Sequence, residues 1–129
     1  YLLDHGRPSR PDALVGHRLV LLTGALARTD AGRWLLAALR NGAQAALRTD
    51  SIPVFLSGVH AGVGLGVLPV GSEELAPELV QLAALPEISP RPLWLAFRGN
   101  GRPSPRARRA AQALEQSLAA ALRRWERHS

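Results

Sequence analysis

The sequence predicts an α/β domain with a mostly parallel sheet flanked by helices, followed by one long C-terminal helix. Short apolar runs that suit buried strands alternate with helical stretches along the chain, which is the order that builds a parallel sheet. Of the 129 residues, 47% are hydrophobic and only 5% aromatic. Alanine and leucine dominate, and this composition indicates helices packed on a small sheet and not a disordered chain.

The first third of the chain predicts a short helix, a helical turn and a buried strand. Tyr1–His5 reads as a helical segment that ends at Gly6, since glycine favours the position after a helix. Pro11–Leu14 reads as one helical turn. His17–Thr23 is a nearly continuous apolar run between turn residues, so we expect a strand buried on both faces. Gly24–Thr29 is then expected to be a loop.

The middle of the chain predicts two helices around a second strand. Asp30–Arg40 has helical periodicity, with Asp30 as the expected N-cap and Asn41-Gly42 as the stop. Ala43–Arg48 is expected to be a strand, although alanine is a poor strand former. Thr49–Ser51 supplies capping side chains for a helix over Ile52–Ala61.

The last third predicts two more strands and the long helix. Leu65–Pro69 and Pro92–Arg98 read as short strands, and Ser72–Ala76 as a helical turn. Ser104 is a good N-cap for a helix that runs to about Arg127. One face of this helix is apolar, carrying Ala107, Ala111, Leu114, Leu118, Leu122 and Trp125.

Charge and missing residue types exclude several classes of function. The net charge is +6, and all 16 basic residues are arginine. This positive charge suggests nucleic acid as a partner. Most arginines are spread singly along the chain, however, so we favour the interpretation that they occupy solvated surface positions. The chain has no cysteine, which excludes disulfides and thiolate sites. It also has no lysine, so neither a P-loop nor a Schiff-base enzyme can form.

No catalytic or metal-binding pattern is present in the sequence. His5, His17, His60 and His128 are too dispersed for a ligand set. Gly62–Gly66 resembles a dinucleotide fingerprint, but it leads from a helix into a strand, the reverse of the Rossmann order. The carboxylates show no spacing typical of a paired acid and base. We therefore expect no enzyme, no metal and no cofactor. No apolar run approaches the length of a membrane span, and we expect a cytoplasmic protein.

Four segments together resemble the effector-binding domain of LysR-type transcriptional regulators. Ala61–Pro69 (AGVGLGVLP) is similar to the family's "aGxGxxxLP" stretch, and Tyr1–Pro8 to its "YLxxHGxP" segment. Pro11–Val20 resembles "pxdLxgHrlv". Pro92–Ala96, followed by Ser104–Arg106 (SPR), is similar to the late strand and the start of the last helix. Each motif is weak alone, but their order and spacing agree across nearly the whole chain.

The resemblance implies a fold like the type II periplasmic binding proteins, in which two α/β subdomains close around a small effector. We expect residues 1–92 to be the second subdomain, and residues 93–129 to be a crossover strand and the helix that returns to the first. The winged helix-turn-helix and most of the first subdomain are expected to be missing. DNA contacts would then belong to that absent N-terminal domain. The implied function is effector sensing that modulates a DNA-bound homo-oligomer.

The resemblance and the α/β rule together predict where the effector binds. Ligands of open α/β sheets bind at the carboxyl ends of strands, next to helix N-termini. Thr49 and Ser51 offer hydroxyls for a carboxylate, although helix capping explains them equally well. Asp50 opposes a second negative charge and would accept from an amine or hydroxyl. The expected effector-binding residues are Leu22, Thr23, Gly24, Thr49, Asp50, Ser51, Ile52, and, at the back wall, Gly66 and Val67.

Two other interpretations remain open. A periplasmic solute-binding domain would share the fold but would need export. A nucleic-acid-binding protein would use the arginines near both ends of the last helix. At its start, Arg106, Arg108 and Arg109 crowd the positive end of the helix dipole.

The apolar stripe of that helix also predicts oligomerisation, because exposed apolar patches of this size usually find a partner.

Overall fold

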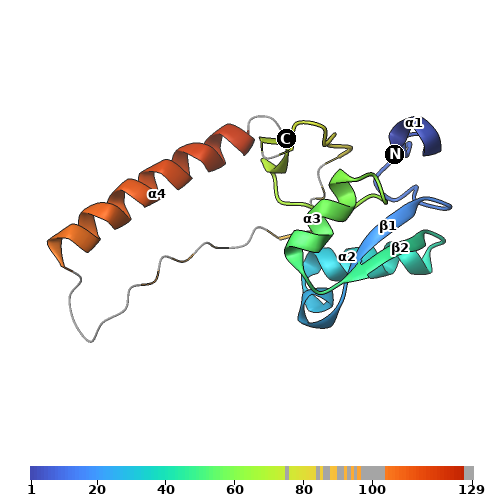
Figure 1. Ribbon diagram of the computed structural model, residues 1–129, viewed down its shortest axis with the longest axis horizontal. Coiled ribbons are helices and arrows are strands. Elements are labelled where there is room, and N and C mark those ends of the chain that lie inside the picture. The colour runs from blue at the N-terminus through green and yellow to red at the C-terminus, as the bar shows by residue number, and fades with distance from the viewer. Residues whose placement is uncertain are drawn as a thin grey trace. The chain divides into compact units, whose positions relative to one another are not determined.

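The computed structural model describes residues 1–74, 76–83, 85, 88–89, 92, 94, 96 and 104–126. The chain divides into two compact units, Tyr1–Ser89 and Pro90–Ser129 (Figure 1). The first unit holds the sheet and the helices that cover it. The second contributes one long helix.

A two-stranded parallel sheet forms the centre of the first unit. β1 (Arg18–Leu22) and β2 (Gln44–Thr49) pair from Arg18 opposite Gln44 to Leu22 opposite Thr49. Every residue of β1 after Arg18 is buried, as expected for an apolar strand covered on both faces. The predicted strands over His17–Thr23 and Ala43–Arg48 are therefore confirmed to within about one residue, a normal uncertainty for element ends.

The predicted third strand, Leu65–Pro69, is reduced to a single bridge. Leu65 pairs in parallel with Leu19. Leu65 donates to the carbonyl of Arg18 at 2.8 Å and accepts from the amide of Val20 at 2.9 Å. The prediction of a strand was wrong in extent. Gly66 and Pro69 explain this, because glycine weakens strand pairing and proline has no amide to donate.

The predicted fourth strand, Pro92–Arg98, lies mostly outside the described residues. Pro92, Trp94 and Ala96 are described, and none of them is in a strand. Within the described part of the chain, the sheet therefore has two strands and one bridge, and the mostly parallel α/β class is supported on this smaller scale.

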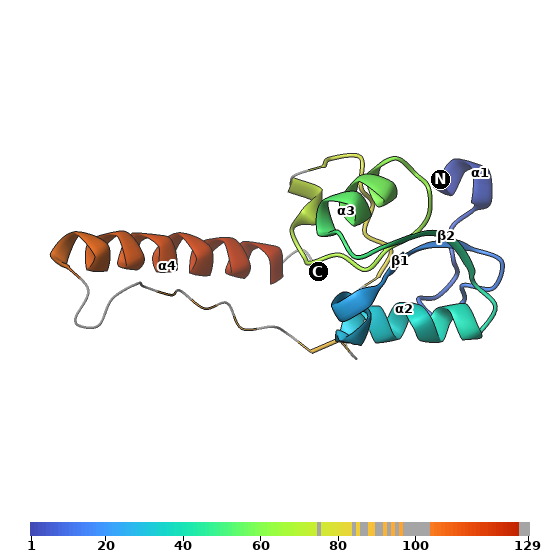
Figure 2. The ribbon, with the colours of Figure 1, turned by 60° about the horizontal axis from the view of Figure 1, so that its bottom comes forward.

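Two helices cover opposite faces of the sheet (Figure 2). These are α2 (Asp30–Arg40) and α3 (Ile52–His60), both close to their predicted bounds. Leu35 of α2 is fully buried and Phe55 of α3 is 2% exposed. Their side chains join the strand residues in one apolar core, whose buried members are Leu14, Leu19, Val20, Leu21, Leu22, Leu35, Ala43 and Phe55.

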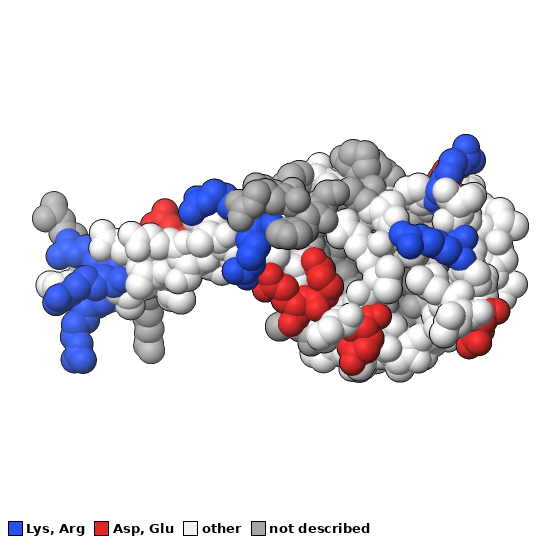
Figure 3. Space-filling view, turned by 90° about the horizontal axis from the view of Figure 1, so that it is seen from above, with Lys and Arg blue, Asp and Glu red and all other residues white. Residues whose placement is uncertain are grey.

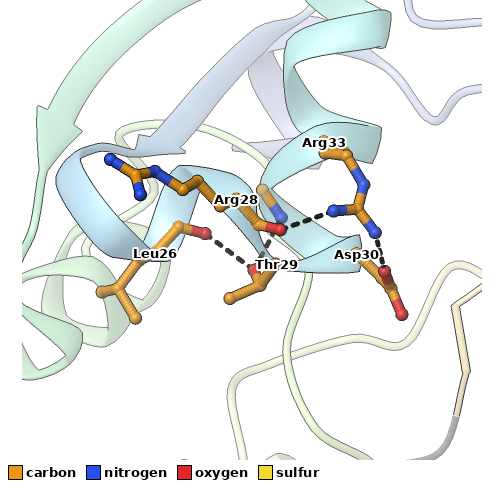
Figure 4. Close-up of polar contacts among 6 residues, drawn as sticks. Leu26, Arg28, Thr29, Asp30 and Arg33 are labelled. Carbon is orange, nitrogen blue, oxygen red and sulfur yellow. Dashed lines mark hydrogen bonds and ion pairs between the residues drawn. The ribbon is translucent and has the colours of Figure 1, made fainter.

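The start of α2 differs from the prediction in two ways (Figure 4). Gly24–Arg28 forms a 3-10 helix, η1, where a loop was expected. The N-cap is Thr29 and not Asp30: the Thr29 hydroxyl accepts from the Gly32 amide at 3.1 Å and donates to the Leu26 carbonyl at 2.7 Å. Asp30 is instead the first helical residue, where its carboxylate pairs with Arg33. That position suits an acid because the helix dipole is positive there.

The N-terminal segment is fastened to the start of β1 by an aromatic side chain. α1 (Leu2–His5) ends at Gly6, as predicted. The Tyr1 hydroxyl accepts from the Arg18 amide at 2.8 Å and lies 3.2 Å from Nδ1 of His17. The Tyr1 ring stacks on His5 with ring centroids 4.4 Å apart. Two of the four histidines thus have ordinary structural surroundings.

Two short predicted turns have different outcomes. Pro11–Leu14 is not helical; it holds a tight turn in which Ala13 donates to the Arg10 carbonyl at 3.0 Å. A 3-10 turn, η2 (Ser72–Glu74), occupies the predicted helical turn at Ser72–Ala76.

The second unit contains α4 (Pro105–Glu126), a single helix of 22 residues. At about 1.5 Å per residue it is ~33 Å long. The Ser104 hydroxyl accepts from the Ala107 amide at 3.2 Å, which confirms the predicted N-cap. The predicted end at Arg127 lies outside the described residues. Among the described helices, none combines the length and apolar character that crossing a membrane requires.

Candidate functional site

The two strand ends that were predicted to bind an effector lie side by side. β1 ends at Leu22 and β2 at Thr49, and the Thr23 amide donates to the Thr49 carbonyl at 2.8 Å. A Cβ placed on Gly24 would lie 3.6 Å from Cβ of Asp50. The segments Leu22–Gly24 and Thr49–Ile52 therefore form one continuous edge, because parallel neighbouring strands end on the same side of a sheet.

The Ser51 hydroxyl caps α3, and the Thr49 hydroxyl bonds within the turn that precedes this helix. Oγ1 of Thr49 accepts from the Ser51 amide at 3.0 Å, and Oγ of Ser51 accepts from the Val54 amide at 3.5 Å. Each hydroxyl also carries one O–H donor, so capping leaves the hydrogen available for a ligand acceptor. Both residues are half-buried. The capping interpretation is confirmed for Ser51, and it is compatible with ligand binding.

An apolar surface adjoins these hydroxyls on the first turn of α3. Ile52 is 46% exposed and Val54 is 47% exposed. Sequence reasoning included Ile52 and missed Val54. A signal for Val54 was available, since an apolar residue three positions beyond Ser51 lies roughly 100° around the helix from Phe55. Polar donors beside branched apolar side chains are typical of small-molecule sites.

Three predicted site residues have packing roles. Leu22 is 5% exposed and its side chain belongs to the core, so only its backbone borders the edge. A Cβ on Gly66 would lie 2.5 Å from Cγ2 of Val59 and 3.0 Å from Cζ of Phe55. Gly66 thus permits α3 to lie close over the segment after Leu65. Val67 packs against the core as well.

Asp50 is the one charged residue among the nine predicted site residues, and it is exposed. Asp50 directly precedes Ser51, the N-cap of α3, so it lies near the positive end of that helix dipole. A ligand carboxylate placed at the same point would meet this charge. A ligand amine or hydroxyl would find an acceptor there.

A shallow hollow of about 290 Å³ lies elsewhere, at the start of α2, lined by Asp30, Arg33, Trp34 and Ile88. The Arg33 guanidinium already has partners within the protein, since it pairs with Asp30 and donates to the Arg28 carbonyl at 2.6 Å. We therefore give more weight to the strand-end edge than to this hollow. Within the described residues, no three His, Asp or Glu side chains gather as a metal ion would require.

An exposed ion pair joins the end of α3 to the segment after η2. Nε2 of His60 lies 3.1 Å from Oε2 of Glu78. The pKa of the Glu78 carboxyl is lowered from its ordinary value of 4.5, first by a hydrogen bond from its own backbone amide and then by one from His60. Both partners are well exposed, so the pair contributes little to stability.

This lowered pKa predicts a small pH dependence of stability. Glu78 stabilises the fold above its unfolded pKa of about 4.5, and the contribution is lost as the pH falls through the lower folded pKa. Glu78→Gln should therefore be slightly less stable than the parent at pH 6 and equal to it in strong acid. Thermal unfolding across pH checks this, with Glu73→Gln as the control. Identical curves for Glu78→Gln and the parent at every pH would contradict the assignment.

Comparison with known protein families gives one match that covers most of the chain. The family model described as the LysR substrate binding domain matches residues 1–119. The matched region includes the whole first unit and most of α4. Comparison with curated proteins and with solved structures gives no significant match.

Proposed function

Since the chain belongs to the LysR substrate binding domain family, we propose that it senses a small effector for a bacterial LysR-type transcriptional regulator. This family comprises ligand-binding parts of regulators and not catalysts. Membership disfavours the periplasmic interpretation, and a regulator of transcription would act in the cytoplasm. The observation that carries the proposal is the meeting of the β1 and β2 ends with the start of α3, joined by the 2.8 Å bond from Thr23 to Thr49.

The effector-binding surface that we propose runs from Thr23 and Gly24 across Thr49–Ile52. The hydroxyls of Thr49 and Ser51 would donate to a carboxylate or carbonyl of the effector. Ile52, with Val54 beside it, would contact an apolar body. Asp50 would accept from an amine or hydroxyl. These groups together favour an effector that is a small acid with an apolar part. They also favour an effector with an amine or hydroxyl that donates a hydrogen bond to Asp50.

We further propose that residues 1–92 act as the second of two subdomains that close on the effector, with residues 93–129 returning to the first. The compact unit Tyr1–Ser89 supports this division. The effector would bind the closed arrangement more tightly and shift its population. DNA-binding domains in the assembled regulator would respond to that shift, so sensing requires no bond to be made or broken in the effector.

The proposal predicts that Thr49→Ala and Ser51→Ala each weaken effector binding about tenfold, the scale of one lost hydrogen bond. The measurement is a titration of the ¹⁵N-labelled full chain, followed by amide chemical shifts, with amino acids, aliphatic acids and aromatic acids. Amide shifts detect weak binders and place them on the sequence.

Thr29→Ala is the matched control, because Thr29 caps α2 as Ser51 caps α3 but lies outside the proposed surface. It should lower stability and leave affinity unchanged. A binder that perturbs residues 49–54 and loses affinity in both site variants would support the surface. Unchanged affinity in both site variants would remove the surface from the proposal while leaving family membership intact.

A further inference from the structure

The net positive charge of the chain is confined to its second unit. Residues 1–89 hold 7 arginines and 8 acids, a net charge of −1, whereas residues 90–129 hold 9 arginines and 2 acids, a net charge of +7. The two values add to the +6 of the whole chain. Such an asymmetry between two parts of one chain is typical of a protein that contacts a polyanion.

Arginines and neutral residues share one exposed face of α4. Arg109, Gln116 and Arg123 recur every seven residues, so they lie almost on one line along the helix. The residues beside this line are Arg106, Gln112, Ala113 and Ala120. We call these seven residues the basic face of α4. All seven are exposed and none of them is acidic, since Glu115 lies on the flank, about 100° around the helix from Gln116.

The basic face lies opposite the apolar residues of the same helix. At about 100° per residue, Gln116 is about 160° from Leu118, and Arg109 is about 140° from Leu114. The apolar side therefore remains available to return to the first subdomain, as proposed above, while the basic side stays in solvent. The two sides of α4 can serve different partners at the same time.

The arginines of the basic face have no acidic partner within the described part of the chain. None of the ion pairs found there involves Arg106, Arg109 or Arg123. The first turn of α4 also holds no acid, although the positive end of a helix dipole favours acids and disfavours arginine. Helix stability therefore does not explain Arg106 and Arg109, and a negative charge from outside the chain would offset both.

The separation of the arginines indicates an extended partner. Arg109 and Arg123 lie ~21 Å apart along the helix, and Figure 3 shows arginine side chains near both ends of α4 with few charges between them. A small anion would reach only one end. Double-stranded DNA carries one negative charge per about 1.7 Å of its axis, so it meets both ends at once. We propose that the basic face of α4 binds the phosphate backbone of double-stranded DNA without reading its sequence.

The neutral residues of the basic face suit a contact with phosphates. Gln112 and Gln116 carry amide donors of the kind that bind phosphate oxygens. Ala113 and Ala120 are small, so the DNA backbone can approach the helix closely. These contacts carry no sequence information, because base edges are read inside the grooves. The surface is thus separate from the DNA-binding domains of the assembled regulator and from the effector surface of the first unit.

Fluorescence anisotropy with the full chain and a labelled duplex of about 20 base pairs tests the proposal. We expect a Kd of about 1–100 µM at 50 mM salt, the usual range for sequence-independent binding. Three phosphate contacts should raise this Kd ~40-fold between 50 and 200 mM salt. A second duplex of unrelated sequence should bind equally well. The proposal is overturned by no binding at 50 mM salt, by binding that salt does not weaken, or by a strong preference for one duplex.

Paired charge removals then locate the contact. Arg109→Gln with Arg123→Gln should weaken binding at least tenfold and reduce the slope of log Kd against log salt concentration by about 2. The control, Arg40→Gln with Arg48→Gln, removes the same charge from exposed positions of the first unit and should change the Kd by less than about threefold. Circular dichroism verifies that both variants stay helical. Equal losses in the two variants would show that only net charge matters, and the assignment to α4 would fail.

Competition with poly-L-glutamate separates DNA from an acidic protein as the partner. An extended glutamate chain carries one charge per about 3.3 Å, roughly half the charge density of the duplex. At equal charge concentration it should displace the labelled DNA at least tenfold less effectively than unlabelled duplex does. Equal displacement would assign the basic face to acidic proteins and overturn the proposal.

Discussion

Gly32→Ala is expected to destabilise the unit Tyr1–Ser89 by about 3 kcal/mol, although alanine is the better helix former by about 1 kcal/mol. A Cβ on Gly32 would lie 2.3 Å from the Leu26 carbonyl oxygen and 2.7 Å from Cα of Ala27. Both atoms belong to the backbone of η1, so a rotamer change cannot relieve the clash. The 3-10 helix would have to move away from α2, and the Thr29 hydrogen bonds would be disturbed.

Urea unfolding followed by tryptophan fluorescence measures this effect. Trp94 and Trp125 lie in the second unit, so Trp94→Phe and Trp125→Phe in the background leave Trp34 of α2 as the reporter of the first unit. Gly58→Ala is the matched control on α3. Its Cβ would meet Cδ2 of Leu47 at 2.7 Å, the mobile end of a side chain, so its cost should stay below about 1 kcal/mol. A Gly32→Ala chain as stable as the parent would contradict the packing of η1 on α2.

The sequence predicted those helices and strands whose local signals agree with their tertiary surroundings. α3 is capped by Ser51 and β1 is uniformly apolar, so capping chemistry and burial lead to the same assignment. The N-cap of α2 was predicted one residue late, because Thr29 and Asp30 are both good caps. Which of the two residues caps α2 depends on the Leu26 carbonyl. The 3-10 helix η1 brings this carbonyl within hydrogen-bond distance of the Thr29 hydroxyl.

The length of the third strand was overestimated, because an apolar run in the sequence does not show which residues pair with a neighbouring strand. Leu65 makes the bridge to Leu19. Gly66, in contrast, leaves room for the side chains of α3 to pack against it, and no local sequence pattern reveals such a contact between distant segments. The candidate site could be predicted in outline, since parallel strands end together. The separation of site residues into exposed ones such as Asp50 and buried ones such as Leu22 required the structure.

Phe55→Ala is expected to destabilise the same unit by about 3–5 kcal/mol, the usual range for removing a buried phenylalanine. Phe55 is 2% exposed, and its ring fills the space between α3 and the segment at Gly66. The same helix begins at the proposed effector surface, and the Phe55 amide donates to the Ser51 carbonyl at 2.9 Å. Loss of the ring would therefore loosen the helix that positions Ser51 and Ile52. A loss of less than about 1 kcal/mol in urea unfolding would contradict this central position in the core.

A double-mutant cycle with Gly66 separates the ring's packing from its general hydrophobicity. Phe55→Leu keeps an apolar side chain and should cost about 1–2 kcal/mol. Gly66→Ala alone should cost about 1–3 kcal/mol, because its Cβ would lie within 3.0 Å of Cζ of Phe55. In the double variant the smaller leucine leaves room for that methyl group, so the total loss should fall short of the sum of the single losses. Strict additivity would show that the two sites do not share this space, and that Gly66 is required only by Val59.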